Sequence, residues 1–353
     1  MKSPFTYCSR ILALAALLIL VLAGCGSQTS SGSNSGSITL NLGYFPNLTH
    51  AVALVGVERG TFQNALGPNV TLATKTFNAG PALIEALFAG DIDIGYVGPS
   101  PAINGYVKSH GEALRIIAGA ASGGASLIVR PGANIQTAKD LANKKIADPQ
   151  LGGTQDVSLR YYLQQNGLKT VDKGGNVQIL PTDNSTILTL FKQGKIDGAW
   201  VPEPYATRLV VEDGGKVFVD ERTLWPDGKF ITTDVVVRTA FLNAHPDLVN
   251  KFLQAHVDTI QYILSNPDSA KSIANDQIKL ITGKALPSKE IDLAYNNLDI
   301  TYDPLSSTLQ ESANRAFALG FLGSTNPNLT GIYYLGPLNQ ILVSKGLATI
   351  AGP

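Results

Sequence analysis

The sequence predicts an α/β fold of two similar lobes, mainly because a short unit occurs twice. The stretch from Phe88 to Ala102, FAGDIDIGYVGPSPA, recurs loosely from Phe191 to Ala206 as FKQGKIDGAWVPEPYA. Each copy reads as a helix end, a glycine that tolerates the left-handed conformation, a short apolar strand, a proline turn and a new helix start. The chain has 353 residues, of which 44% are hydrophobic and 15% charged, so it is long enough for two packed domains of roughly 100–200 residues.

The first lobe is predicted from alternating apolar residues and from helix start and stop signals. Asparagine and threonine are good N-caps, and proline fits the first position of a helix. In chain order we expect a strand over 38–43, a helix from Asn47 or Thr49 to Gly60, a helix from Pro81 to Gly90, a strand over 92–97, a buried strand over 113–121 and a mobile loop over 122–124.

The second lobe is predicted in the same way. Its expected elements are a strand over 144–148, a helix from Thr154 to Asn166, a strand over 177–180, a helix capped by residues 183–185 and a strand over 217–219. The similar runs LIVR at 127–130 and VVVR at 235–238 are interpreted as the outgoing and returning strands of a hinge. From Ala240 onward the period is helical, with breaks at four prolines, and this tail is expected to pack on the first lobe.

The N-terminus has the features of an export signal. Lys2 and Arg10 precede an apolar run over 11–22, which is too short for a bilayer core that needs roughly twenty residues. The run ends in Leu22-Ala23-Gly24-Cys25, which resembles the lipobox of bacterial lipoproteins; an uncleaved anchor is the alternative. We therefore expect a signal peptide over 1–24, lipidation of Cys25, a Gly/Ser-rich tether over 25–37 and an extracytoplasmic protein anchored to the cell membrane by lipid.

Composition and motifs exclude several functions. Twenty-seven basic and twenty-seven acidic residues balance, without the basic patch that a nucleic-acid partner requires. The two cysteines, Cys8 and Cys25, lie near the N-terminus, so the body of the chain has no disulfide framework. The four histidines lack metal-ligand spacing, and the common hydrolase, nucleotide and zinc-protease motifs do not occur. We expect no metal, no cofactor and no catalysis.

The repeat, the LIVR and VVVR runs and the lipobox together resemble the substrate-binding proteins of ABC importers, over about residues 38–350. Within that family the chain is similar to the aliphatic sulfonate, taurine and nitrate branch, which shares its fold with binders of thiamine-pyrimidine precursors. The motifs that carry this resemblance are GYFPNLTHA, FNAGPALIEALFAGDIDIGYVGPSPA, GGTQD and DGAWVPEPYA.

The resemblance implies a two-lobed periplasmic-binding-protein fold, type II-like, with two α/β domains joined by a two-strand hinge. It also implies a membrane permease and an ATPase as partners, and a monomer. Lobe 1 is expected to comprise 38–129 plus 236–353, and lobe 2 to comprise 130–235. An enzyme on the same fold and a ligand-sensing extracellular module are the alternatives from other functional classes.

The ligand site is expected where helices begin at the carboxyl ends of the strands, because free backbone N–H groups and helix dipoles bind anions there. Arg and Lys do not occur in the candidate loops, which argues against a ligand of high negative charge. A small sulfonate, taurine-like compound, nitrate or pyrimidine precursor fits this expectation. The candidate ligand-binding residues are Tyr44, Phe45, Asn47, His50, Asn78, Gly80, Pro99, Ser100, Gly123, Gly153, Thr154, Gln155, Asn184, Trp200, Glu203 and Tyr205.

Two roles within this set are more specific. Glu203 is the first candidate for the counter-charge of a ligand amine, ahead of Asp148, Asp156 and Asp183; the alternatives are that it is a solvated loop residue or that it caps its own helix. Trp200 is the favoured aromatic wall, with core packing as the alternative for every aromatic residue. The equivalent residues Asp93 and Asp197 begin their strands away from the predicted site, so a structural role is expected for them.

Overall fold

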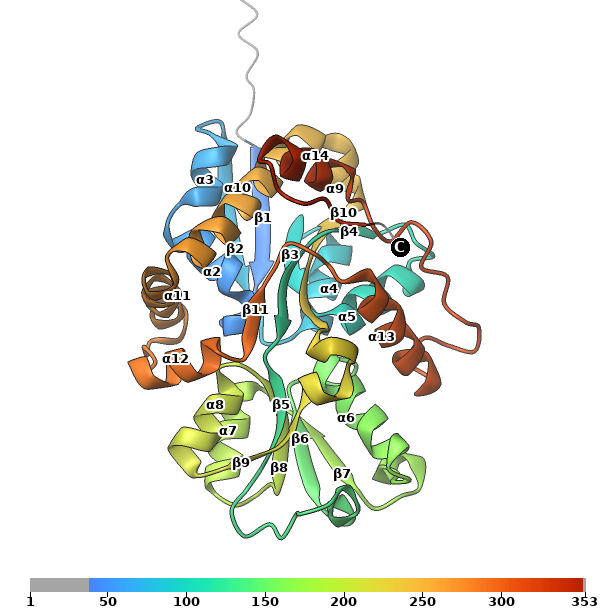
Figure 1. Cartoon of the computed structure of the whole chain (residues 1–353). Helices are drawn as coiled ribbons and strands as arrows, with labels where there is room; N and C mark the ends of the chain where they lie inside the picture. Colours follow the sequence, from blue (N-terminus) through green and yellow to red (C-terminus); the bar gives the residue numbers. More distant parts are fainter. Residues whose placement is uncertain (1–37, 352–353) are drawn as a thin grey trace, which may run out of the picture. The chain divides into compact units, whose positions relative to one another are not determined.

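The computed structural model describes residues 38–351, which contain two β-sheets covered by helices (Figure 1). The predicted signal peptide, the tether and Cys25 lie outside the described residues. The first sheet has the strand order β2 (Val70–Thr76), β1 (Ile38–Tyr44), β3 (Ile94–Val97), β10 (Ile231–Arg238), β4 (Leu114–Gly123) and β11 (Leu298–Ile300). The second has the order β7 (Gln178–Pro181), β6 (Lys145–Asp148), β8 (Gly198–Pro202), β5 (Ala125–Val129) and β9 (Lys216–Asp220).

The two sheets repeat the same pattern, as the duplicated unit predicts. In the first, β1 pairs in parallel with β2 and β3, and β10 pairs antiparallel with β3 and β4. In the second, β6 pairs in parallel with β7 and β8, and β5 pairs antiparallel with β8 and β9. The repeated strand is therefore β3 in one sheet and β8 in the other, and each is preceded by a helix that ends at a left-handed glycine, Gly90 or Gly194.

The similar runs LIVR and VVVR have equivalent surroundings in the two sheets. The first run lies in β5 and the second in β10, which belong to different sheets and do not pair with each other. Each ends in an arginine that pairs with the aspartate opening the repeated strand: Arg130 with Asp197 and Arg238 with Asp93. The arginine N–H donates to that aspartate's main-chain oxygen at 2.8 Å in both cases. The two runs lie in the strands that follow the outgoing and the returning crossing between the sheets, and a structural role for the two aspartates is confirmed.

The chain crosses between the sheets at two places. The first is Gly124, between β4 and β5, and the second is the segment 221–230, between β9 and β10. A Cβ atom on Gly124 would lie 2.1 Å from Leu298 Cδ2, and its φ is +72°, so the crossing needs glycine. The expected loop over 122–124 is mostly strand, since Ser122 and Gly123 belong to β4. We propose lobe borders at these crossings, instead of at 129 and 236.

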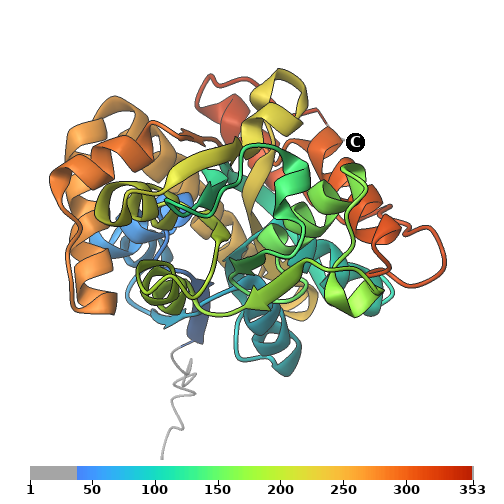
Figure 2. The same ribbon diagram turned by 90° about the horizontal axis from the view of Figure 1, so that it is seen from below.

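The helices cover both faces of each sheet. In the second sheet, α6 packs on one face, and α7 with α8 packs on the other (Figure 2). In the first sheet, the tail helix α10 packs against α2, α3 and α14, as predicted for the C-terminal tail. The α-helices are α2 (Ala51–Glu58), α3 (Thr61–Leu66), α4 (Gly80–Ala89), α5 (Pro99–Lys108), α6 (Thr154–Gln165), α7 (Asn184–Lys192), α8 (Tyr205–Asp213), α9 (Thr239–Ala244), α10 (Pro246–Ser265), α11 (Pro267–Thr282), α12 (Ser288–Tyr295), α13 (Ser306–Ala318) and α14 (Gly336–Ser344).

Short 3-10 helices complete the connections at Leu48–His50, Ala138–Leu141, Val171–Lys173, Glu221–Leu224 and Pro226–Gly228. Within residues 38–351, no helix combines the length and apolar character needed to cross a membrane.

Candidate functional site

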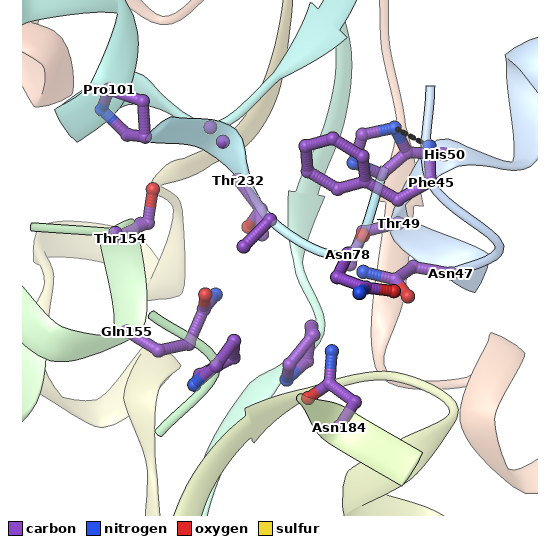
Figure 3. A pocket seen from close by; sticks show the side chains of 16 residues that line it. Phe45, Asn47, Thr49, His50, Asn78, Pro101, Thr154, Gln155, Asn184 and Thr232 are labelled. Atoms are coloured by element: carbon purple, nitrogen blue, oxygen red, sulfur yellow. Dashed lines mark hydrogen bonds between the residues drawn. The ribbon is translucent and has the colours of Figure 1, made fainter. Parts of the chain in front are cut away.

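A small cavity lies where both sheets end, and it brings together segments far apart in the sequence (Figure 3). The cavity is small, with a free volume of about 30 Å³ for the centre of a water-sized sphere. This is enough for a compact chemical group in close contact with the walls. None of the described residues that line it is charged. They are Phe45, Asn47, Thr49, His50, Asn78, Ala79, Gly80, Gly98, Pro101, Pro149, Gly153, Thr154, Gln155, Asn184, Pro202 and Thr232.

Four α-helices begin at this cavity, two beside each sheet. No N-cap side chain bonds to the first turn of any of them within the described residues, so the first-turn N–H groups are available to a ligand, except at Pro81, Pro99 and Pro101, which have none. The positive ends of four helix dipoles converge there, which favours an anion without any cationic side chain. The first helical residues are Gly80 in α4, Pro99 in α5, Thr154 in α6 and Asn184 in α7.

The polar side chains in the cavity are amides and hydroxyls. Thr154 and Asn184 are buried, and neither Thr154 Oγ1 nor Asn184 Oδ1 has a hydrogen-bond partner among the described residues. An unpaired buried polar atom costs about 1–3 kcal/mol, so both atoms are poised for a partner from a ligand. Thr232 differs, because its hydroxyl already donates to the Gly123 carbonyl.

The two sides of the cavity approach each other closely at Gly98 and Thr154. A Cβ atom on Gly98 would lie 2.2 Å from Thr154 Oγ1, far inside van der Waals contact. Gly98 is the N-cap of α5 and Thr154 opens α6, so this approach joins the two sheets' helices across the site. Glycine at position 98 therefore permits the close approach of α5 and α6, which any larger side chain would block.

His50 is a neutral residue of the cavity wall. Burial lowers its pKa from 6.5 to about 3, so the ring is uncharged near neutral pH. The Phe45 N–H donates to His50 Nδ1 at 3.4 Å, which leaves the proton on Nε2, and the two rings lie 4.2 Å apart. His50 can therefore act as a hydrogen-bond donor but not as a fixed positive charge.

Comparisons with known proteins agree with this geometry. The model of the NMT1-like family matches residues 33–276. The chain belongs to the NMT1-like family. It is 29% identical, over 75% of its length and 79% of the relative's, to the taurine-binding periplasmic protein of Escherichia coli (strain K12).

Solved structures show the same fold for this NMT1-like protein. The alkanesulfonate-binding protein SsuA from Xanthomonas axonopodis pv. citri, bound to MOPS, superposes with a TM-score of 0.71 at 17% identity, covering 84% of this chain and 98% of SsuA. The periplasmic nitrate-binding protein NrtA from Synechocystis PCC 6803 superposes with a TM-score of 0.68 at 15% identity, covering 87% of this chain and 88% of NrtA. The predicted two-lobed binding-protein fold is confirmed.

Nine of the sixteen candidate residues of this NMT1-like protein line the cavity. They lie at or just before the starts of the 3-10 helix Leu48–His50 and of α4, α6 and α7, where the sequence showed N-cap residues and glycines. They are Phe45, Asn47, His50, Asn78, Gly80, Gly153, Thr154, Gln155 and Asn184.

The turn in the first copy of the repeat reaches the cavity, but through residues other than the ones named from the sequence. Pro99 and Ser100 do not line the cavity, whereas Gly98 and Pro101 do. Residues three apart share one face of a helical turn, so 98 and 101 face the site together while the residues between them point elsewhere. In the second copy Pro202 takes the place of Gly98, and Tyr205 lies instead in a separate crevice beside Arg208.

The aromatic walls predicted at Trp200 and Tyr44 are core residues. Trp200 is fully buried, donates from Nε1 to Glu221 Oε2 at 2.7 Å and packs edge-on against Tyr162. Tyr44 is buried on the other side of its strand, and Gln277 Nε2 donates to its hydroxyl at 2.8 Å. Alternate residues of a strand face opposite sides, which the sequence alone could not assign here.

Glu203 caps its own helix and links the two lobes. Its carboxylate accepts hydrogen bonds from the Thr207 N–H and hydroxyl, each at 3.0 Å, and from Asn297 Nδ2 at 2.7 Å. Its main-chain oxygen accepts from the Leu48 N–H at 3.0 Å. Glu203 is absent from the cavity lining, so the counter-charge prediction for it is dropped. Gly123 likewise lies outside the cavity, at the chain crossing.

Two of the other acidic candidates lie behind the cavity loop over 149–153. Asp156 accepts from the Gly152 N–H at 2.8 Å and from Arg160 Nε at 2.7 Å, which anchors the loop. Asp148 is fully buried, and burial together with the neighbouring Asp156 carboxylate raises its pKa well above the usual value. Burial therefore disfavours the charged form of Asp148, and the residue lies outside the cavity lining. Asp183 is exposed, in an outer crevice that continues from the cavity.

The sequence reasoning missed seven cavity residues. Most of them adjoin residues that it named, and helical spacing from these could have identified them. Thr232 is the exception, because it enters from β10, far along the chain, and no pattern in the sequence marks it. The missed residues are Thr49, Ala79, Gly98, Pro101, Pro149, Pro202 and Thr232.

Proposed function

We propose that this protein is the extracytoplasmic substrate-binding component of an ABC importer and that it captures a small organic oxyanion, best represented by an aliphatic sulfonate or taurine-like compound. The observation that carries the proposal is an uncharged cavity at four helix starts, in which Thr154 Oγ1 and Asn184 Oδ1 have no hydrogen-bond partner within residues 38–351. Such a site stabilises a single negative charge through backbone N–H groups and hydroxyls. The taurine-binding relative and the SsuA neighbour support this class of ligand.

The proposal extends to the parts of the chain that the structure does not describe. Export through residues 1–24, lipid attachment at Cys25 and a flexible tether over 25–37 would hold the binding domains at the membrane surface, beside a permease and an ATPase. The protein is proposed to act as a monomer. A site lined by amides, hydroxyls, prolines and one neutral histidine, without carboxylate, lysine or thiol among its described lining residues, supports binding without turnover.

The unpaired atoms indicate an asymmetric ligand. Thr154 Oγ1 can donate to an oxyanion, whereas Asn184 Oδ1 is an acceptor and needs an N–H or O–H group. A sulfonate with an amine or hydroxyl at its other end would satisfy both atoms. Nitrate, the second candidate, fits the small free volume and the NrtA neighbour but would leave Asn184 Oδ1 unpaired.

Isothermal titration of the purified protein with taurine, ethanesulfonate and nitrate tests this function. We expect saturable binding, with taurine tightest, and an unchanged ligand by mass spectrometry. Replacing Asn184 with Leu should weaken taurine binding by about tenfold more than ethanesulfonate binding, because only taurine has an ammonium group that loses its hydrogen-bond acceptor. Failure of all three anions to bind, or conversion of the bound compound, would rule out the proposal.

A further inference from the structure

A second, larger hollow lies on the far side of the cavity loop, between α6 and the end of α13. We call it the α6–α13 groove. One wall is formed by residues 160–173, which include the end of α6 and the turn after it, and the other by residues 318–321. The two helices pack side by side (Figure 1). The groove has a free volume of about 550 Å³, measured in the same way as for the first cavity. This lies within the range of pockets that hold small organic molecules.

The groove has an apolar floor. Leu163 is buried, Phe321 is half-buried, and Leu151 reaches the groove from the cavity loop with 56% of its surface exposed. An exposed leucine beside a half-buried aromatic ring offers apolar surface that a bound hydrocarbon or aromatic group would remove from water. Such burial contributes about 25 cal/mol per Å².

The rim of the groove is positively charged. Lys169 and Lys173 are exposed, and neither ammonium group forms an ion pair or hydrogen bond with the described residues. The acidic residue of the groove, Asp172, is already paired with Arg160, at 3.1 Å. Two unpaired cations above an apolar floor complement a molecule with an apolar body and one anionic end.

We propose that the α6–α13 groove is a second binding site, specific for an amphiphilic organic anion such as a medium-chain carboxylate. It differs from the first cavity, which is small and uncharged and binds through helix starts. Binding in the groove depends instead on burial of the ligand's apolar surface and on contacts with the rim lysines. The inference does not depend on the ligand assigned to the first cavity.

The groove and the first cavity share one loop. Leu151 lines the groove, whereas Pro149 and Gly153 line the cavity. A Cβ atom on Gly152 would lie 3.9 Å from Phe321 Cε1, so the Phe321 ring rests against this loop. An occupant of the groove therefore holds the loop and both groove walls in the arrangement that also forms the cavity. The two sites should bind with positive, reciprocal coupling.

Octanoate is a suitable probe, with octanol as its uncharged analogue. Titration of the purified full chain should show saturable octanoate binding that is tighter than octanol binding. Replacing both rim lysines with glutamate, K169E/K173E, should weaken octanoate at least about fivefold and leave octanol nearly unchanged, because each reversed charge replaces an attraction with a repulsion. The matched control is K195E/K216E, which reverses two exposed lysines of the same lobe outside the groove.

The apolar floor is tested separately by Phe321→Ser, which should weaken octanoate and octanol to a similar extent. Equal octanoate affinity in the wild type and K169E/K173E, or equal losses in K169E/K173E and the control, would overturn the proposal. No octanoate binding at millimolar concentration would overturn it as well. Taurine titrations of the same variants report on the first cavity, so failure of one site is distinguishable from failure of the other.

Discussion

Replacement of Thr154 by valine separates ligand binding from stability at the cavity. The two side chains have nearly the same shape, and the change deletes Oγ1, which has no partner among the described residues. A hydrogen bond to a charged group contributes about 1.5–3 kcal/mol, so we expect affinity for a sulfonate to fall by roughly 10- to 150-fold. The free energy of unfolding without ligand should stay the same or rise by up to about 1 kcal/mol, because a buried unpaired hydroxyl is removed.

Isothermal titration gives the change in affinity, and urea unfolding gives the change in stability. Thr186→Val is the matched control, because Thr186 is exposed on α7 and lies outside the cavity. An affinity within twofold of the wild type would refute the role of the Thr154 hydroxyl. A loss of affinity with an equal loss of stability would instead point to a structural role and refute the reasoning in the same way.

Three further predictions concern the cavity wall and the lobe contacts. Gly98→Ala should abolish tight binding, because the new Cβ would meet Thr154 Oγ1 at 2.2 Å, and adding Thr154→Ala should partly restore it in titrations. Glu203→Ala should lower the urea-unfolding free energy by about 1–3 kcal/mol while leaving the ratio of taurine to ethanesulfonate affinity unchanged, and a changed ratio would revive its counter-charge role. The folded pKa of His50, about 3, lies below its unfolded value of 6.5, so unfolding takes up a proton and acidification from neutral pH removes stability. Between pH 7 and pH 5 the wild type should lose about 2 kcal/mol more than His50→Gln in urea unfolding, and parallel pH profiles would contradict this assignment.

Much of the fold could be predicted because the signals are local. The left-handed glycines at 90 and 194 and the apolar strands after them are properties of a few consecutive residues. The aspartate–arginine pairs show where local reasoning fails. The runs ending in Arg130 and Arg238 are alike because each pairs with an equivalent aspartate, and that partner lies far away in the sequence.

The same division applies to the site. Helix starts at Gly80, Thr154 and Asn184 were visible in the sequence, since N-caps, prolines and glycines determine where a helix can begin. The sequence did not show which side chains face the cavity. Trp200 and Glu203 belong to the right turn and strand but point into packed and hydrogen-bonded surroundings.

The sequence by itself determined the duplicated α/β unit, the absence of cationic residues from the ligand loops and the helix starts that favour an anion, because these depend on residue type and short spacing. Tertiary structure alone decided that Thr232 enters the cavity, that Gly98 meets Thr154 and that a charged groove lies behind the cavity loop. These features depend on how the two lobes meet, which brings together residues that are far apart in the chain and have no local sequence signal for each other.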